Sequence, residues 1–168
     1  MDAPTTHRTF VSYIDRTREF YAAQGYERPY RWARHDDAPF ASLAKPLAES
    51  RVTLVTTASP LVERNAREGV LRGGKAVWSA GTGETPKRLY TDDLAWDKES
   101  THTDDVDSFL PLTHLRAAAE KKRIGALAPR FHGVPTDYSQ RRTIEQDAPE
   151  VLARCREDAA DVALLVPL

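Results

Sequence analysis

Three short apolar segments recur along the chain, each preceded by a segment with helical spacing. RVTLVTTAS (51–59) is β-branched and almost continuously apolar at its start, and a Ser-Pro pair closes it. RIGALAP (123–129) and DVALLVPL (161–168) have the same character. Such runs are typical of strands that are buried on both faces of a parallel sheet.

Amphipathic segments lie between these apolar runs. Residues 8–24 repeat aromatic and aliphatic side chains at helical spacing and end at Gly25, which predicts a first helix. A second, short helix is predicted over about 39–49, where Pro46 shortens or kinks it. Residues 112–122 predict a third helix, directly before the second apolar run.

A fourth helix is predicted to begin at residues 147–150, which read Asp-Ala-Pro-Glu. Asp147 would cap the helix, proline would occupy its first turn, and Glu150 would complete a capping box. The alternation of helices with apolar strands predicts an α/β fold: a Rossmann-like parallel sheet flanked by helices in three layers, with right-handed crossovers. We expect residues 39–168 to form this domain, and residues 1–38 to form an N-terminal helix and loop that pack on it.

For residues 60–100 the pattern of apolar and polar residues gives the least clear prediction of secondary structure. Glycine pairs flank a short predicted strand at 76–79, and another strand is predicted to begin at 89–90. We expect hairpins or loops across this stretch.

Composition narrows the class of protein. The chain has 168 residues, 40% hydrophobic and 29% charged, with a formal net charge of -1. This balance gives no electrostatic reason to expect a nucleic acid or an anionic membrane as partner. Cys155 is the single cysteine, which excludes an internal disulfide and a cysteine-based zinc site, and its place on an apolar helical stripe favours a buried packing role. The N-terminus has no basic stretch followed by an apolar run, so we expect a cytoplasmic protein.

Residues 102–107, His-Thr-Asp-Asp-Val-Asp, combine a histidine with three carboxylates. These are metal-ligand types, but consecutive residues do not easily converge on one ion without a dedicated loop. We therefore expect a solvated acidic loop and no metal site.

Ligands of open parallel sheets bind at the carboxyl ends of the strands. Two of the three predicted strand ends carry polar residues, and the third ends in Val166, Pro167 and Leu168. The candidate substrate-binding residues are Thr56, Thr57 and Ser59 after the first strand, and Arg130 and His132 after the second. The Arg130 guanidinium can hold a carboxylate through two hydrogen bonds, and the His132 imidazole can donate a proton. Simpler roles stay open: Arg130 on the surface or beside a helix dipole, His132 in a solvated loop, and the hydroxyls as helix caps.

Three of these segments together resemble a known family. PLTHLRAAAEKKRIGALAPRF is similar to the "PLxxLRxLxxxGxIGxLAPR" segment of the selenoprotein B component of glycine, sarcosine, betaine and D-proline reductases. RVTLVTTASP resembles that family's "VALVTTAG" strand, and DVALLVPL resembles its last strand before the redox motif. The resemblance covers most of residues 39–168 in order, and residues 60–100 depart from it.

The resemblance implies an oxidoreductase component that cleaves a carbon–nitrogen bond in an amino acid or its N-methylated relative. A selenol or thiol performs the reduction, with a pyruvoyl group on a partner subunit and a thiol reductant as electron source. In that family, the strand that matches DVALLVPL runs directly into a selenocysteine or cysteine motif. No cofactor is expected within this chain, and its catalytic residue is expected beyond Leu168.

The sequence stops at the position where the family carries its redox residue. Because UGA encodes selenocysteine and is ordinarily a stop codon, we expect that an in-frame UGA ended the reading after Leu168. Residues 1–168 would then lack the last part of the domain and be inactive alone. The alternative, from another functional class, is a non-catalytic α/β domain that binds a small molecule or a partner subunit and ends at Leu168.

Overall fold

The computed structural model describes residues 13–26, 33, 36–37, 41–60, 76–91, 102–136 and 139–168. The chain forms two compact units, residues 1–39 and residues 40–168. The first unit contains α1 (Tyr13–Ala23), and Gly25 follows it with a φ of +83°, a left-handed conformation common after helices. The first predicted helix is therefore present over 13–23, while residues 8–12 lie outside the described part.

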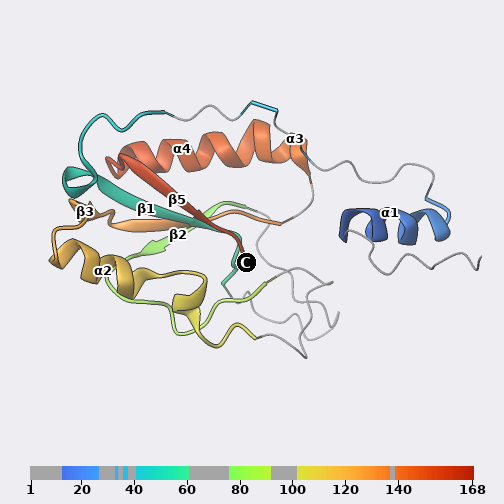
Figure 1. Cartoon of the computed structure of the whole chain (residues 1–168), viewed down its shortest axis with the longest axis horizontal. Coiled ribbons are helices and arrows are strands. Elements are labelled where there is room, and N and C mark those ends of the chain that lie inside the picture. Colours follow the sequence, from blue (N-terminus) through green and yellow to red (C-terminus); the bar gives the residue numbers. More distant parts are fainter. Residues whose placement is uncertain are drawn as a thin grey trace, which may run out of the picture. The chain divides into compact units, whose positions relative to one another are not determined.

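A mixed sheet forms the centre of the second unit, which has an α/β fold (Figure 1). Its five strands are β1 (Arg51–Thr56), β2 (Trp78–Gly81), β3 (Ala126–Leu127), β4 (Arg130–Gly133) and β5 (Val162–Val166). β1 pairs in parallel with β5 along one edge and with β3 and β4 along the other, whereas β2 pairs antiparallel with β4. The three predicted apolar strands are thus parallel neighbours, and β2 adds an antiparallel edge.

β3 and β4 form one strand interrupted by a bulge. Val52 of β1 lies opposite Leu127, and Val55 lies opposite His132. Two residues lie between these pairs on β1 and four on the facing strand, so the bulge adds two residues. Pro129 suits the bulge because it has no N–H to contribute to the ladder.

The bulge corrects one prediction about the second apolar strand. We expected this strand to end at residues 128–132, but it continues to Gly133. Arg130 therefore lies at the start of β4, part of the way along the sheet, and its carbonyl accepts a hydrogen bond from the Thr53 hydroxyl at 3.0 Å. The sequence pattern missed this because a proline inside an apolar run is more typical of a strand end.

The two longer helices of this unit cover opposite faces of the sheet (Figure 1). α2 (Leu112–Glu120) lies over the face that contains the buried Leu54, and α4 (Ala148–Glu157) lies over the face that contains Val55. These neighbours point to opposite faces because successive side chains alternate along a strand. Cys155 lies on the face of α4 that packs against the sheet and is buried there, in agreement with the packing role predicted for it.

The predicted helix at 39–49 is reduced to a single 3-10 turn, η1 (Leu47–Glu49). Pro46 accepts the first hydrogen bond of this turn, from the Glu49 N–H. Residues 41–49 are all exposed, so no packed face stabilises a longer helix there. The expected strand at 89–90 is likewise reduced to one bridge, between Tyr90 and Ser59.

The C-terminal helix begins earlier than predicted. α3 (Gln140–Arg142) follows Ser139, whose hydroxyl accepts a hydrogen bond from the Arg142 N–H at 3.3 Å. A π-type segment (Thr143–Asp147) then runs directly into α4. The predicted N-cap at Asp147 is wrong because the backbone before it is already helical, which leaves no free helix start to cap.

Candidate functional site

The carboxyl edge of the sheet brings the ends of β1 and β5 together. Thr57 follows β1, and its hydroxyl accepts a hydrogen bond from the Leu168 N–H at 2.8 Å and donates one to the Leu168 carbonyl at 3.2 Å. The Thr56 hydroxyl accepts a hydrogen bond from a backbone N–H two residues on, and Ser59 exchanges two backbone hydrogen bonds with Tyr90. The three predicted hydroxyl residues therefore lie at the expected edge, where they fix the turn after β1.

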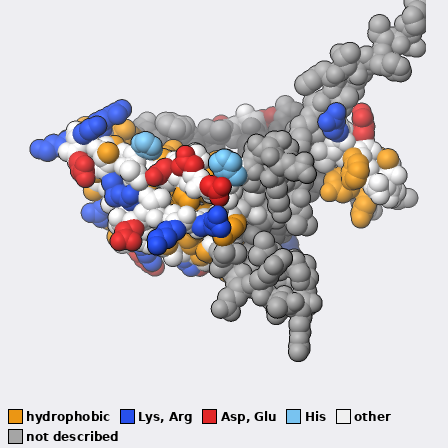
Figure 2. Space-filling view, turned by 90° about the horizontal axis from the view of Figure 1, so that it is seen from below, with side chains coloured by type: hydrophobic (Ala, Val, Ile, Leu, Met, Phe, Trp, Pro, Cys, Tyr) orange, Lys and Arg blue, Asp and Glu red, His pale blue; other side chains and the backbone are white. Residues whose placement is uncertain are grey.

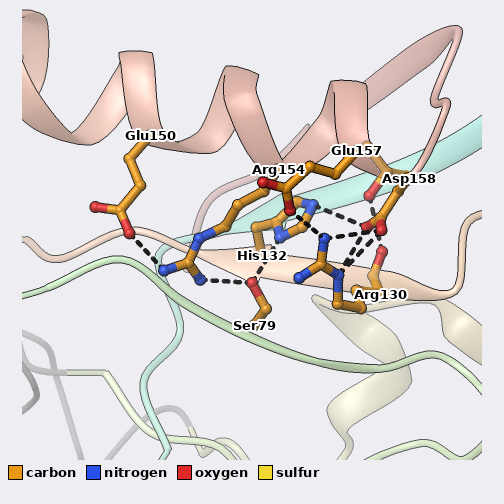
Figure 3. A network of polar contacts seen from close by, with 8 residues as sticks. Ser79, Arg130, His132, Glu150, Arg154, Glu157 and Asp158 are labelled. Carbon is orange, nitrogen blue, oxygen red and sulfur yellow. Dashed lines mark hydrogen bonds and ion pairs between the residues drawn. The ribbon is translucent and has the colours of Figure 1, made fainter.

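Arg130 lies beneath α4 and is already paired with two carboxylates (Figure 3). Its Nε donates to both carboxylate oxygens of Asp158 at 3.0 Å, and its Nη2 donates to Glu157 Oε2 at 3.0 Å. The Asp158 side chain is 7% exposed and that of Glu157 is 66% exposed. These carboxylates raise the pKa of the Arg130 guanidinium above its usual range. The group predicted to hold a substrate carboxylate is thus bound to two carboxylates of its own chain.

His132 is fully buried beside this pair. Its Nδ1 lies 2.8 Å from Ser79 Oγ, and its Nε2 lies 3.7 Å from Asp158 Oδ2. Arg154 donates a hydrogen bond to the same Ser79 Oγ at 2.7 Å, so the serine hydroxyl links the imidazole to α4. Burial lowers the pKa of His132, so the ring is neutral at pH 7. The side chain lies inside β4 and not in a solvated loop.

Ser79 and Arg154 complete the arrangement, although neither was predicted as a site residue. Ser79 belongs to β2 and lies opposite His132 in the antiparallel pair. Arg154 projects from α4, donates to the Val77 carbonyl at 3.2 Å and pairs with Glu150 one helical turn earlier. The four-residue spacing of Glu150 and Arg154 was a signal for that pair, but no sequence feature placed β2 beside β4.

We call this set the α4–sheet cluster (Figure 3). Its members are Ser79, Arg130, His132, Glu150, Arg154, Glu157 and Asp158. Two guanidinium groups face three carboxylates around a neutral imidazole, and most of the polar atoms are satisfied within the cluster. Such an arrangement holds α4 on the sheet, and its imidazole can take up one proton. The five predicted residues thus divide between two places: three hydroxyl residues at the carboxyl edge, and Arg130 with His132 in the cluster.

A groove lies between α4 and β5, with a volume of about 450 Å³. Its walls include a stripe at helical spacing on α4 and alternate residues of β5. The lining residues are Val55, Val134, Thr143, Asp147, Ala148, Val151, Leu152, Cys155, Ala160, Asp161, Val162, Ala163 and Leu165. Leu152 is 49% exposed and Leu165 is 70% exposed, so apolar surface is open to solvent along both walls.

The acidic segment 102–107 directs its carboxylates to separate partners. Asp107 Oδ1 accepts a hydrogen bond from the Thr113 N–H at the start of α2, and Asp104 pairs with Arg88. Within the described ranges, no group of three or more His, Cys, Asp or Glu side chains is placed to hold a metal ion.

None of the helices in the described part of the chain has the length and apolar character needed to cross a membrane. Comparison with protein-family models, with curated proteins and with solved structures finds no match for this chain.

Proposed function

We propose that this chain is a component of a selenol- or thiol-dependent reductase that cleaves a carbon–nitrogen bond in substrates of the glycine, betaine, sarcosine or D-proline type. The motif resemblance supports the assignment, and one structural observation carries it. Thr57 holds both backbone groups of Leu168, so the end of β5 lies beside the end of β1 at the carboxyl edge. A redox selenocysteine or cysteine directly after Leu168 would stand at this edge, where open parallel sheets bind ligands.

The proposal includes a Rossmann-like three-layer domain in the cytoplasm, a thiol reductant and a partner subunit that carries a pyruvoyl group. The soft nucleophile must be ionised at neutral pH, which requires an exposed position near positive potential. Arg130 can serve a substrate carboxylate only if that carboxylate replaces Glu157, because Asp158 is buried against the guanidinium. His132 is fully buried and would not contact the substrate directly; its contact is with the Ser79 hydroxyl.

Reading the native gene past codon 168 tests this proposal. A UGA or cysteine codon, followed in frame by a stretch that encodes a helix, is the expected result. The extended protein should then incorporate selenium or show a reactive thiol, and should consume one of the four substrates when partner subunit and dithiol are supplied. A UAA or UAG codon with no such frame behind it would contradict the reductase assignment.

A second candidate is a non-catalytic α/β domain that binds a small molecule or a partner subunit. It is favoured by the internal pairing of Arg130 and the burial of His132, which leave little polar chemistry open to a substrate. Thermal-shift titration with glycine, sarcosine, betaine and D-proline separates the two candidates. Stabilisation by one of these that is lost in Thr57→Val supports a small-molecule site at the carboxyl edge, whereas no shift with any of them favours a partner-binding role.

A further inference from the structure

The attachment of α4 to the sheet is half apolar and half charged. Along residues 148–158, four side chains are not exposed, and they recur at helical spacing: Val151, Arg154, Cys155 and Asp158. The apolar pair belongs to a cluster of four buried residues, whereas α2 on the other face packs on a cluster of eight. Among the described residues, the apolar core under α4 is thus the smaller, so polar contacts contribute a larger share of its attachment.

Both of these charged side chains lead to His132. Arg154 donates to Ser79 Oγ at 2.7 Å, and that oxygen lies 2.8 Å from His132 Nδ1. Asp158 Oδ2 lies 3.7 Å from His132 Nε2, and both Asp158 oxygens accept hydrogen bonds from Arg130 Nε. His132 is fully buried, and within the described ranges its Nε2 has no hydrogen-bond partner. The imidazole therefore lies at the centre of the polar contacts between α4 and the sheet (Figure 3).

A proton added to this imidazole would create a buried cation. β2 contributes the Ser79 hydroxyl to its surroundings. The charged groups that face it from β4 and from the end of α4 are Arg130, Arg154, Glu157 and Asp158. The two guanidinium groups repel the added charge, while Asp158 is already engaged by Arg130 and Glu157 is 66% exposed to water. Burial lowers the pKa of His132, and the carboxylates offset this only in part, so protonation weakens the attachment.

We propose that the α4–sheet cluster is an acid-sensitive switch: protonation of His132 releases α4 from the sheet, while α2 and the apolar core beneath it stay in place. Release exposes the imidazole to water, which removes the cost of burying its charge. It also exposes Val55 and Cys155, which are buried while α4 is docked. Local opening is expected where few apolar contacts hold an element. The switch does not depend on the reductase chemistry, so either proposal can fail while the other stands.

The direction of the switch follows from the two states of His132. In the open state the imidazole has the ordinary pKa of 6.5, and in the docked state its pKa is lower. The docked state keeps its full advantage above pH 6.5 and loses it as the pH falls from 6.5 towards the lower pKa. Between pH 7.5 and 5.5, this one proton can raise the open fraction by at most about tenfold.

Amide hydrogen exchange of the whole chain tests the inference. The quantity compared is the protection factor, which is the intrinsic exchange rate divided by the observed rate at the same pH. From pH 7.5 to 5.5 we expect the protection factors of α4 to fall by about three- to tenfold, and those of α2 to change by less than about twofold. In His132→Gln the fall in α4 should be absent. The contrast between the two helices is measured in the wild type, so the test stands even if that variant folds poorly.

A histidine on the α2 side provides the matched control. Histidine side chains lie at the surface there, among interspersed acidic and basic groups (Figure 2). His114 is exposed in the first turn of α2, and His114→Gln should keep the wild-type fall in the protection of α4. Unchanged protection of α4 in the wild type, or the same fall in His132→Gln, would overturn the inference. An equal fall in α2 and α4 would also overturn it, because the whole domain would then unfold together.

Discussion

At the scale of single residues, the α4–sheet cluster centres on His132 and Asp158, which are both buried. His132 has no exposed surface, and its neighbours are Ser79, Asp158, Arg130 and Arg154. Desolvation lowers its pKa below the usual value of 6.5, and the two arginines lower it further, while the carboxylates of Asp158 and Glu157 act in the opposite direction. The folded chain therefore takes up this proton less readily than the unfolded chain.

The resulting pH dependence has a definite sign. The stability contributed by neutral His132 is complete above pH 6.5 and is lost as the pH falls from 6.5 towards the lower folded pKa. In this window the free energy of unfolding should fall by at most about 1.4 kcal/mol per pH unit for this one proton. Urea denaturation between pH 7.5 and 5 should show this slope in the wild type and a flatter profile in His132→Gln. His114→Gln, at an exposed site, serves as the control; an unchanged slope in His132→Gln would contradict the assignment.

Replacing Arg130 should lower the stability of the fold, because the Asp158 carboxylate would then lose its cation. Arg130→Gln leaves the nearly buried Asp158 without its cation, and we expect the free energy of unfolding to fall by more than it does for a surface ion pair. Chemical denaturation measures the change. The matched control is Arg141→Gln, since Arg141 pairs with Glu145 at the surface, where such pairs contribute less than about 0.5 kcal/mol. If both variants lower the free energy of unfolding equally little, the Arg130–Asp158 pair does not hold α4 on the sheet.

At the scale of secondary-structure elements, the residues that follow α2 and α4 have a left-handed backbone conformation, which glycine adopts more easily than the residues present. α2 and α4 both end in a Schellman turn, with Lys122 at a φ of 53° and Ala159 at a φ of 51°. Non-glycine residues adopt this left-handed region at a cost of about 1 kcal/mol. The backbone is therefore strained at Lys122 and Ala159, shortly before β3 and β5, and glycine at either position would relieve that strain.

Ala159→Gly should raise the free energy of unfolding by about 0.5–1 kcal/mol, because glycine removes the strain at this φ. The same substitution at Ala153, an exposed position inside α4, should lower it by about 1 kcal/mol, because glycine disfavours a helix interior. Thermal unfolding of both variants measures the contrast. Two changes of the same sign would refute the strain at Ala159.

The elements that sequence reasoning located well are those with strong local signals. β1, β5 and α2 lie within a few residues of their predicted bounds, because apolar runs and helical spacing reflect burial directly. The start at Ser139 was missed because the Asp-Ala-Pro-Glu segment imitates a capping box inside a continuing helix. The α4–sheet cluster was predicted only in part, because Ser79 reaches His132 through a pairing between distant strands.

At the scale of the whole molecule, both hydrophobic clusters belong to residues 40–168. We expect a fragment of residues 40–168 to unfold cooperatively, with a melting temperature within about 5 °C of the full chain. Circular dichroism on heating tests this. A second fragment that ends at Ala160 provides the contrast, because it loses the five-residue pairing of β5 with β1 and should not fold cooperatively. Equal melting of the two fragments would contradict the role given to β5.

The two-residue bulge between β3 and β4 also determines which changes of length the sheet can absorb. Because the insertion is even, Phe131 still faces the α2 side and His132 still faces α4. Deleting one residue at the exposed Pro129 would exchange these faces and drive an imidazole into the apolar core. Deleting both Ala128 and Pro129 would restore the alternation, with loss of the hydrogen bonds that these residues make to Val52 and Thr82. We therefore expect relatives that are shorter or longer by two residues in this segment to keep the fold. Relatives that differ by one residue should not keep it.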